Sequence, residues 1–214
     1  MKHSRVELTR DVMPEIQKPK QSICVFCGSS PGSDPRYVPL AANTGRAIGS
    51  QGYGLVYGGG GAGLMGATAN AAFEAGGYVL GIIPDFLMTP ERANCKGEQR
   101  IVPNMHERKM QMFEASDAFI ILPGGIGTIE EAVEIMCWMR LQLHQKPILF
   151  LSPDNYWAPL LDLIKHTIDA RLSPDWMLDD IFTAETANDA MAKIKAAWAE
   201  PAKELRPVVP ISKM

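Results

Sequence analysis

The stretch Leu122-Pro123-Gly124-Gly125-Ile126-Gly127-Thr128-Ile129-Glu130-Glu131 joins an apolar run, residues 118–122, to an amphipathic run, residues 130–143. The first run predicts a β-strand and the second a helix. Three glycines in four positions leave main-chain N–H groups uncovered at the positive end of that helix. Such a helix start binds anions, commonly phosphate. With two carboxylates beside it, the stretch predicts an enzyme that acts on a phosphorylated small molecule.

The same alternation of apolar and amphipathic runs continues on both sides of this stretch. Continuously apolar strands separated by helices predict a parallel sheet covered on both faces, a Rossmann-like doubly wound α/β fold. The expected strands are 22–27, 54–57, 78–83, 118–122 and 147–151, and the expected helices are 37–50, 64–75, 106–115, 130–143, 156–170 and 184–198.

Length and composition favour one domain. The 214 residues suit a single nucleotide-binding catalytic domain over residues 21–200, and the 46% of hydrophobic residues can bury a full core. Residues 1–20 are polar and contain two prolines, which predicts a flexible N-terminal arm, and residues 201–214 are expected to form a C-terminal tail.

Charge and cysteine content exclude several classes of protein. A formal net charge of -3 argues against a nucleic-acid binder. The first 20 residues lack an apolar signal core, and no apolar run is long enough to cross a bilayer, so we expect a cytoplasmic protein with no membrane partner. Cys24 and Cys27 form a C-x-x-C pair, typical of zinc or redox sites. The pair has no second Cys/His pair at finger spacing and lies in an apolar strand, so we expect no metal.

Three loops rich in glycine or small residues follow expected strands: 28–32, 58–66 and 124–128. Ligands of such sheets bind beyond the carboxyl ends of the strands, so the three loops predict one composite site. The middle loop contains G-x-G-x-x-G in two registers, which is typical of dinucleotide binding. Its glycine run is longer than that motif needs, and Asp85, the acid at about the right distance, follows a proline. Nucleotide contact and a tight turn that lets backbone pack on backbone both remain open for this loop.

Two further motifs each allow a structural and a functional interpretation. Thr128 and Glu131 fit a capping box, which would leave Glu131 bonded to its own helix start, yet capping does not explain the glycines. Arg108 and Lys109 begin another expected helix, where the dipole disfavours cations unless an anion is near. In the alternative interpretation they pair with Glu114 on an exposed face.

Taken together, these residues resemble the LOG (Lonely Guy) family, the cytokinin-activating phosphoribohydrolases. The family signature P-G-G-x-G-T-x-x-E is present at residues 123–131, and the likeness extends from residue 23 to residue 151. Supporting pieces are 25–30, 57–60, 63–66 and the sequence Met105-His106-x-Arg108-Lys109.

The resemblance implies hydrolysis of the N-glycosidic bond of nucleoside 5′-monophosphates without a cofactor, in a homodimer or larger even homo-oligomer. It places Arg108 and Glu131 at the catalytic positions. With the composite site, it implies that the small-molecule nucleotide contacts Gly28, Ser29, Gly59, Gly60, Glu91, Lys109, Gly124, Gly125, Ile126, Gly127, Thr128, Ile129 and Glu130. Two departures bear on the accepted base: the segment 90–104 differs from plant members, and Cys137 replaces a frequent small hydroxyl.

Three alternatives stay open beside a cytokinin-specific enzyme. One is a general AMP nucleosidase. Another is a non-catalytic nucleotide carrier, similar to molybdenum-cofactor carriers, and the last is an NAD-dependent oxidoreductase. Older names call proteins of this family lysine decarboxylases, but no lysine stands out as a Schiff-base former.

Overall fold

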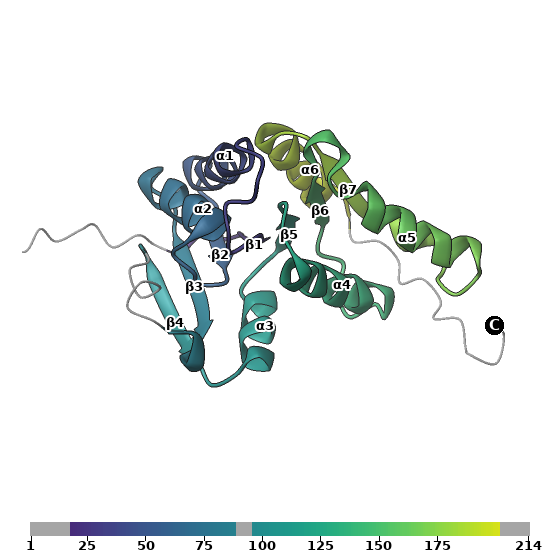
Figure 1. The fold of residues 1–214 in the computed structure, drawn as a ribbon, viewed down its shortest axis with the longest axis horizontal. Coiled ribbons are helices and arrows are strands. Elements are labelled where there is room, and N and C mark those ends of the chain that lie inside the picture. The colour runs from purple at the N-terminus through teal and green to yellow at the C-terminus, as the bar shows by residue number, and fades with distance from the viewer. Residues whose placement is uncertain (1–17, 89–95, 202–214) are drawn as a thin grey trace, which may run out of the picture.

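Seven parallel strands form one sheet in the computed structural model, which describes residues 18–88 and 96–201 (Figure 1). Their order across the sheet is β4-β3-β2-β1-β5-β6-β7. This confirms the expected doubly wound α/β fold. The strands are β1 (Ser22–Phe26), β2 (Gly54–Tyr57), β3 (Val79–Pro84), β4 (Glu98–Val102), β5 (Ala118–Ile121), β6 (Ile148–Leu151) and β7 (Ile181–Ala184).

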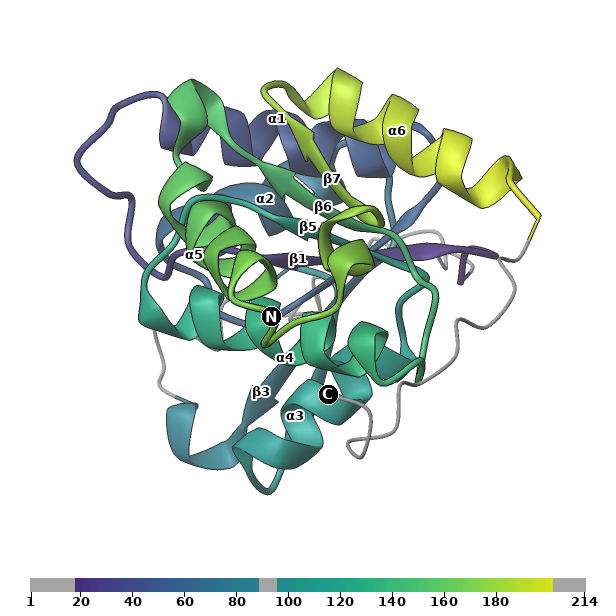
Figure 2. The ribbon, with the colours of Figure 1, turned by 90° about the vertical axis from the view of Figure 1, so that its right-hand side faces the viewer.

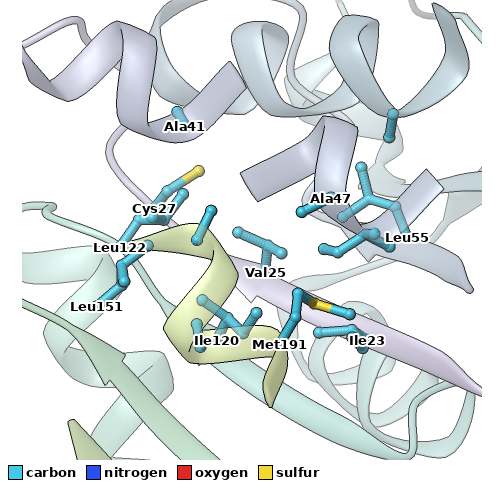
Figure 3. Packing of buried hydrophobic residues seen from close by; sticks show 14 of the residues in the cluster. Ile23, Val25, Cys27, Ala41, Ala47, Leu55, Ile120, Leu122, Leu151 and Met191 are labelled. Carbon is cyan, nitrogen blue, oxygen red and sulfur yellow. The ribbon is translucent and has the colours of Figure 1, made fainter. Parts of the chain in front are cut away.

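Helices cover both faces of the sheet, as Figure 2 shows with the sheet nearly edge-on. One layer contains α1 (Tyr37–Ser50), α2 (Gly63–Glu74) and α6 (Ala187–Ala199), and the other contains α3 (Met105–Glu114), α4 (Ile126–Arg140) and α5 (Ala158–Asp169). Each layer closes its own hydrophobic core against the sheet. Figure 3 shows the core under α1 and α6, where alternate residues of β1 meet side chains from β5 and α6.

The central strand explains the two cysteines. All five residues of β1 are buried, as expected for a parallel strand covered on both faces. Cys24 belongs to the core on the α4 side, and Cys27, just beyond the strand, belongs to the core on the α1 side. The two thiols therefore face opposite layers and cannot bind one metal ion together. Burial raises the pKa of both thiols.

The strand order also fixes where a ligand can bind. From β1 the chain builds outward through β2, β3 and β4, and then returns to place β5 on the other side of β1. The direction of winding thus reverses between β1 and β5. Ligands of such sheets occupy the crevice at the carboxyl ends of these two strands.

Three expectations about the elements were wrong. The edge strands β4 and β7 were not predicted, because neither is a continuously buried apolar run. The expected helix 184–198 begins at Ala187, since β7 occupies the residues just before it. The helix expected over residues 130–143 begins four residues earlier, at Ile126, and ends at Arg140.

Some expectations fall on residues outside the described ranges. These are Glu91, most of the expected arm 1–20, and all but the first residue of the expected tail 201–214. Within the described ranges, no helix has the length and apolar character needed to cross a membrane.

Candidate active site

The start of α4 carries four main-chain N–H groups with no hydrogen-bond partner among the described residues, those of Gly125 to Thr128. The first helical hydrogen bond is the one from the Ile129 N–H to the Gly125 carbonyl, at 3.0 Å. Gly125 is the N-cap residue, and no side chain caps the helix. Unpaired N–H groups at the positive end of a 15-residue helix are suited to bind an anion. We call residues 124–128 the cradle.

The three glycines of the cradle differ in whether the surrounding atoms leave room for a side chain. A Cβ on Gly124 would lie 2.2 Å from Thr128 Oγ1 and 2.9 Å from the Gly28 nitrogen, so packing within the chain excludes any side chain there. A Cβ on Gly125 or Gly127 would meet nothing within 4 Å. Neither of these two glycines has a positive φ. Neither packing nor backbone conformation requires glycine at these positions, so a ligand that needs the space accounts for them better.

The structure excludes the capping-box interpretation of Thr128 and Glu131. Because α4 begins at Ile126, Thr128 lies inside the first turn and is buried. The Glu131 carboxylate accepts a hydrogen bond from Arg108 Nη1, 2.7 Å away, rather than from its own helix start. Glu131 is therefore available to the site.

Arg108 and Glu131 form a buried ion pair behind the cradle. Arg108 comes from the first turn of α3, and its Nε also donates to the Ile82 carbonyl, at 3.2 Å. Both side chains are about nine-tenths covered, with exposed fractions of 9% and 10%. Gly58 makes room for the guanidinium, since a Cβ there would lie 2.0 Å from Arg108 Nη2. Burial raises the pKa of Glu131, and the charge of Arg108 opposes that rise.

Lys109 forms a second, more exposed cluster with carboxylates of α4. Its Nζ lies 2.5 Å from Glu130 Oε1 and 3.0 Å from Glu134 Oε1. Burial alone would lower the pKa of Lys109, but the two carboxylates outweigh it and raise the pKa. The alternative pairing of Arg108 or Lys109 with Glu114 was wrong, because both cations point across to α4.

The loop 58–66 uses several of its glycines to let backbone pack on backbone. A Cβ on Gly63 would lie 2.4 Å from the Ser29 carbonyl oxygen, and one on Gly66 would lie 2.1 Å from that of Gly61. Gly59 has a φ of +73°, a conformation that favours glycine. A Cβ on Gly60 would meet only the flexible end of Met65. The turn interpretation therefore explains most of this loop, and nucleotide contact at Gly59 and Gly60 stays a prediction.

The three loops that follow β1, β2 and β5 lie together, as expected. The Gly28 N–H donates to the Pro123 carbonyl at 3.1 Å, and the Leu64 N–H donates to the Gly28 carbonyl at 3.2 Å. This second hydrogen bond satisfies one N–H at the start of α2. Among residues 18–88 and 96–201, the start of α4 has no such acceptor, so the cradle is the better candidate for an anion site.

One functional candidate was missed from the sequence. Tyr156, after β6, donates a hydrogen bond from its hydroxyl to the Gly124 carbonyl at 2.8 Å. The available signal was its position: Tyr156 follows a strand whose carboxyl end lies at the same edge of the sheet as the cradle. Its partner is 32 residues away, so no local pattern reveals the contact.

Metal-binding clusters and cavities are the other places where the described residues could form a site. Within residues 18–88 and 96–201, no cluster of three or more His, Cys, Asp or Glu side chains could hold a metal ion. A cavity of about 280 Å³ lies near the amino ends of β6 and β7, away from the cradle, and is lined in part by Trp176, Phe182 and Trp198. The described groups at or beside the cradle are main-chain amides, the Arg108–Glu131 pair, the Lys109 cluster and the Tyr156 hydroxyl.

Comparisons with known proteins identify the family. A family model described as "Possible lysine decarboxylase" matches residues 65–194. A probable cytokinin riboside 5′-monophosphate phosphoribohydrolase from Oryza sativa subsp. japonica is 42% identical over 173 residues, which cover 80% of this chain and 82% of that protein. The cytokinin riboside 5′-monophosphate phosphoribohydrolase of Rhodococcoides fascians is 46% identical over 157 residues, 72% of this chain and 79% of that protein.

A solved structure supports the same fold. The molybdenum cofactor binding protein from the phototrophic bacterium Rippkaea orientalis matches with a TM-score of 0.62 and 20% identity, over 86% of this chain and 100% of that one. At this identity the likeness concerns the fold alone. The family model covers more than half of the chain, and both phosphoribohydrolases exceed 40% identity. This chain therefore belongs to the LOG (Lonely Guy) family.

Proposed function

We propose that this protein hydrolyses the N-glycosidic bond of cytokinin riboside 5′-monophosphates and releases the free base and ribose 5-phosphate. Its relatives' names support this activity. The observation that carries the proposal is the buried Arg108–Glu131 pair. It lies one helical turn beyond four N–H groups that have no partner in the part of the chain that the structure describes. One site thus offers an anion cradle and a carboxylate at a fixed separation.

The helix sets that separation. Glu131 lies four residues beyond Gly127, and α-helices rise about 1.5 Å per residue, so roughly 6 Å along the axis divides the main chain of Gly127 from that of Glu131. A nucleotide whose 5′-phosphate binds the N–H groups of the cradle would bring its ribose near Glu131. Binding energy from the phosphate, which does not react, then supports orientation at the sugar.

Glu131 is proposed to act on the anomeric carbon. Cleavage of a glycosidic bond passes through a sugar with oxocarbenium character, which a nearby carboxylate stabilises. The electrons of the C–N bond leave with the base, and a water oxygen forms the new bond to the anomeric carbon. Glu131 can accept a proton from that water, a role that contributes about 10²–10⁴-fold to the rate. Arg108 favours the ionised carboxylate and holds its orientation.

Other residues are proposed to contact the substrate. Lys109 and Glu130 border the cradle, and their mutual ion pair can exchange for contacts with nucleotide oxygens. Gly28, in the loop after β1, contacts the cradle through the hydrogen bond from its N–H to the Pro123 carbonyl. Ser29, the next residue of that loop, is proposed as a further contact. Glu91 is retained as a proposed contact from the family resemblance.

We also propose a homodimer or larger even assembly. Apolar side chains stand exposed on α4 beside the cradle, with Ile126 83% exposed and Val133 38% exposed. A second subunit that covers this face of α4 would shelter them. Light scattering on the purified protein would test this assembly, and a monomer at micromolar concentration would contradict it.

The alternatives differ in what they need from the site. A carrier that only binds a nucleotide has no need for a buried carboxylate beside the sugar, so the Arg108–Glu131 pair favours an enzyme. A lysine decarboxylase requires a lysine whose amine can lose its proton to form a Schiff base. Lys109 lies between two carboxylates that raise its pKa, which opposes that role. A general AMP nucleosidase uses the same chemistry and differs only in the base.

The test is product analysis with a panel of nucleoside monophosphates. Purified protein incubated with isopentenyladenosine monophosphate should release the base and ribose 5-phosphate, and the rate relative to AMP separates a cytokinin enzyme from a general nucleosidase. Glu131→Gln should lower release by at least about 100-fold while nucleotide binding stays measurable. Glu114→Gln, a carboxylate change on α3 outside the site, is the matched control. Near-normal turnover by Glu131→Gln would remove Glu131 from the mechanism.

A further inference from the structure

The Tyr156 side chain contacts the cradle from outside. Tyr156 lies between a short 3₁₀ turn, Pro153–Asn155, and the start of α5. Its hydroxyl donates to the Gly124 carbonyl oxygen at 2.8 Å. This hydrogen bond joins the segment after β6 to the main chain of the proposed phosphate site.

A hydrogen bond to this carbonyl fixes the direction of the next N–H group. The Gly124 C=O and the Gly125 N–H belong to one planar trans peptide unit, so they point in opposite directions. When the carbonyl turns toward Tyr156, the Gly125 N–H turns away from it. That N–H is the first of the four cradle donors that have no acceptor within the described ranges.

The peptide between Gly124 and Gly125 needs such a restraint. Both residues that flank it are glycines, which accept backbone conformations closed to other residues. A rotation of this peptide would turn the carbonyl oxygen toward the phosphate and the N–H away from it. The cradle would then lose one donor and gain a repulsive oxygen. Within the described residues, the Tyr156 hydroxyl is the hydrogen-bond donor to the Gly124 carbonyl that opposes this rotation.

Tyr156 is itself held firmly. Its ring packs edge-on against Tyr37, with centroids 5.6 Å apart, and against Trp157, with centroids 4.9 Å apart. The turn before it places Asp154 and Asn155 at φ values of 48° and 59°. Asp and Asn adopt such values more readily than other residues with side chains, so both residue types suit this turn. An ion pair with Arg36, from the loop after β1, contacts this turn at Asp154.

We propose that Tyr156 is a positioning residue for the substrate phosphate, because its hydroxyl locks the Gly124–Gly125 peptide with the N–H directed into the cradle. The inference rests on the proposed function, since it assigns Tyr156 to the phosphate subsite of that reaction. It predicts that the hydroxyl matters for ligands that carry a phosphate and not for those that lack one.

The experiment removes the hydroxyl and keeps the ring. Tyr156→Phe is compared with wild type and with Tyr37→Phe, which loses a hydroxyl from the same aromatic cluster without touching Gly124. Titration calorimetry measures binding of inorganic phosphate, ribose 5-phosphate and adenosine, and steady-state assays measure KM and kcat. Thermal unfolding confirms that all three proteins fold.

Tyr156→Phe should weaken binding of phosphate and ribose 5-phosphate by about 3- to 10-fold, which is the effect of one net hydrogen bond. KM should rise by a similar factor, while kcat, adenosine binding and all Tyr37→Phe values stay within about twofold, below the smallest change expected from that hydrogen bond. Equal phosphate affinity in Tyr156→Phe and wild type would overturn the inference and leave the proposed function intact. An equal loss for adenosine would show a merely structural role and also overturn it. A wild-type protein that binds neither phosphate compound would overturn both proposals.

Discussion

A substitution at Gly127 should change protein stability and ligand binding in opposite directions. It occupies the second position of α4, where a Cβ would meet no atom within 4 Å. Gly127→Ala should therefore fold normally and raise stability by about 0.4–1 kcal/mol, because alanine restricts the unfolded chain more than glycine does. For a domain of this size that corresponds to a melting temperature roughly 1–4 °C higher.

The same methyl group should weaken binding at the proposed phosphate site. Side chains on a helix tilt toward its N-terminus, so the new Cβ would lean into the space above the N–H groups of the cradle. A phosphate displaced from one of these donors loses about 1.5–3 kcal/mol, since hydrogen bonds to charged groups are stronger than neutral ones. Affinity for ribose 5-phosphate should fall by roughly 10- to 150-fold.

Calorimetric titration and thermal unfolding of the same samples measure both effects. The matched control is Gly124→Ala, whose Cβ would lie 2.2 Å from Thr128 Oγ1. That variant should lose about 1–3 kcal/mol of stability through overpacking. If Gly127→Ala is stable and binds ribose 5-phosphate as tightly as wild type, the open space at Gly127 does not serve a phosphate, and the reasoning fails.

Three further outcomes follow from the buried groups. Arg108→Met should lower the free energy of unfolding by about 3–5 kcal/mol, because Glu131 is left buried without its cation, and adding Glu131→Leu should recover most of that loss in urea titrations. Burial raises the pKa of Glu131 in the folded protein above its ordinary value of 4.5. Protonation of Glu131 therefore stabilises the folded state fully at pH values below 4.5, and this stabilisation is lost as pH rises through the pKa of the folded state. The stability of wild type relative to Glu131→Gln should thus decline as pH rises above about 4.5, and a difference that grows with pH would contradict the assignment. Cys24 and Cys27 should resist alkylation until the protein unfolds, since both thiols are buried with raised pKa values, and peptide mass mapping would detect early modification.

The central elements could be predicted because their sequence pattern matches their burial. Five strands are buried along their whole length, and their sequences are therefore continuous apolar runs: β1, β2, β3, β5 and β6. The strand β4 carries Glu98, Gln99 and Arg100 in an edge position, where only its last residue is buried. The strand β7 at the other edge is half-buried. Edge strands pair on one side only and can be polar, so apolar runs do not reveal them.

The candidate site could be predicted in part for a similar reason. The glycines and carboxylates at residues 124–131 form a local pattern, and the sequence sufficed to expect an anion site there. Only the family resemblance placed Arg108 with Glu131. The local pattern left this partner open, because Arg108 lies 23 residues away and the two side chains meet only when α3 and α4 pack on the same face. The start of α4 was misplaced because Thr128 and Glu131 imitate a capping box. That local rule yields to the tertiary contact between Arg108 and Glu131.

Several features that reduce stability gather at the start of α4. Gly127 gives up helix propensity where alanine would fit, four N–H groups lack partners among the described residues, and Arg108 and Glu131 bury opposite charges that apolar side chains could replace. Sequences that fold well rarely break several local rules in one place without a functional reason. Combining Gly127→Ala with Arg108→Met and Glu131→Leu should therefore give a protein at least as stable as wild type that has lost nucleotide hydrolysis. A triple variant that unfolds at a lower temperature than wild type would show instead that these residues serve the fold.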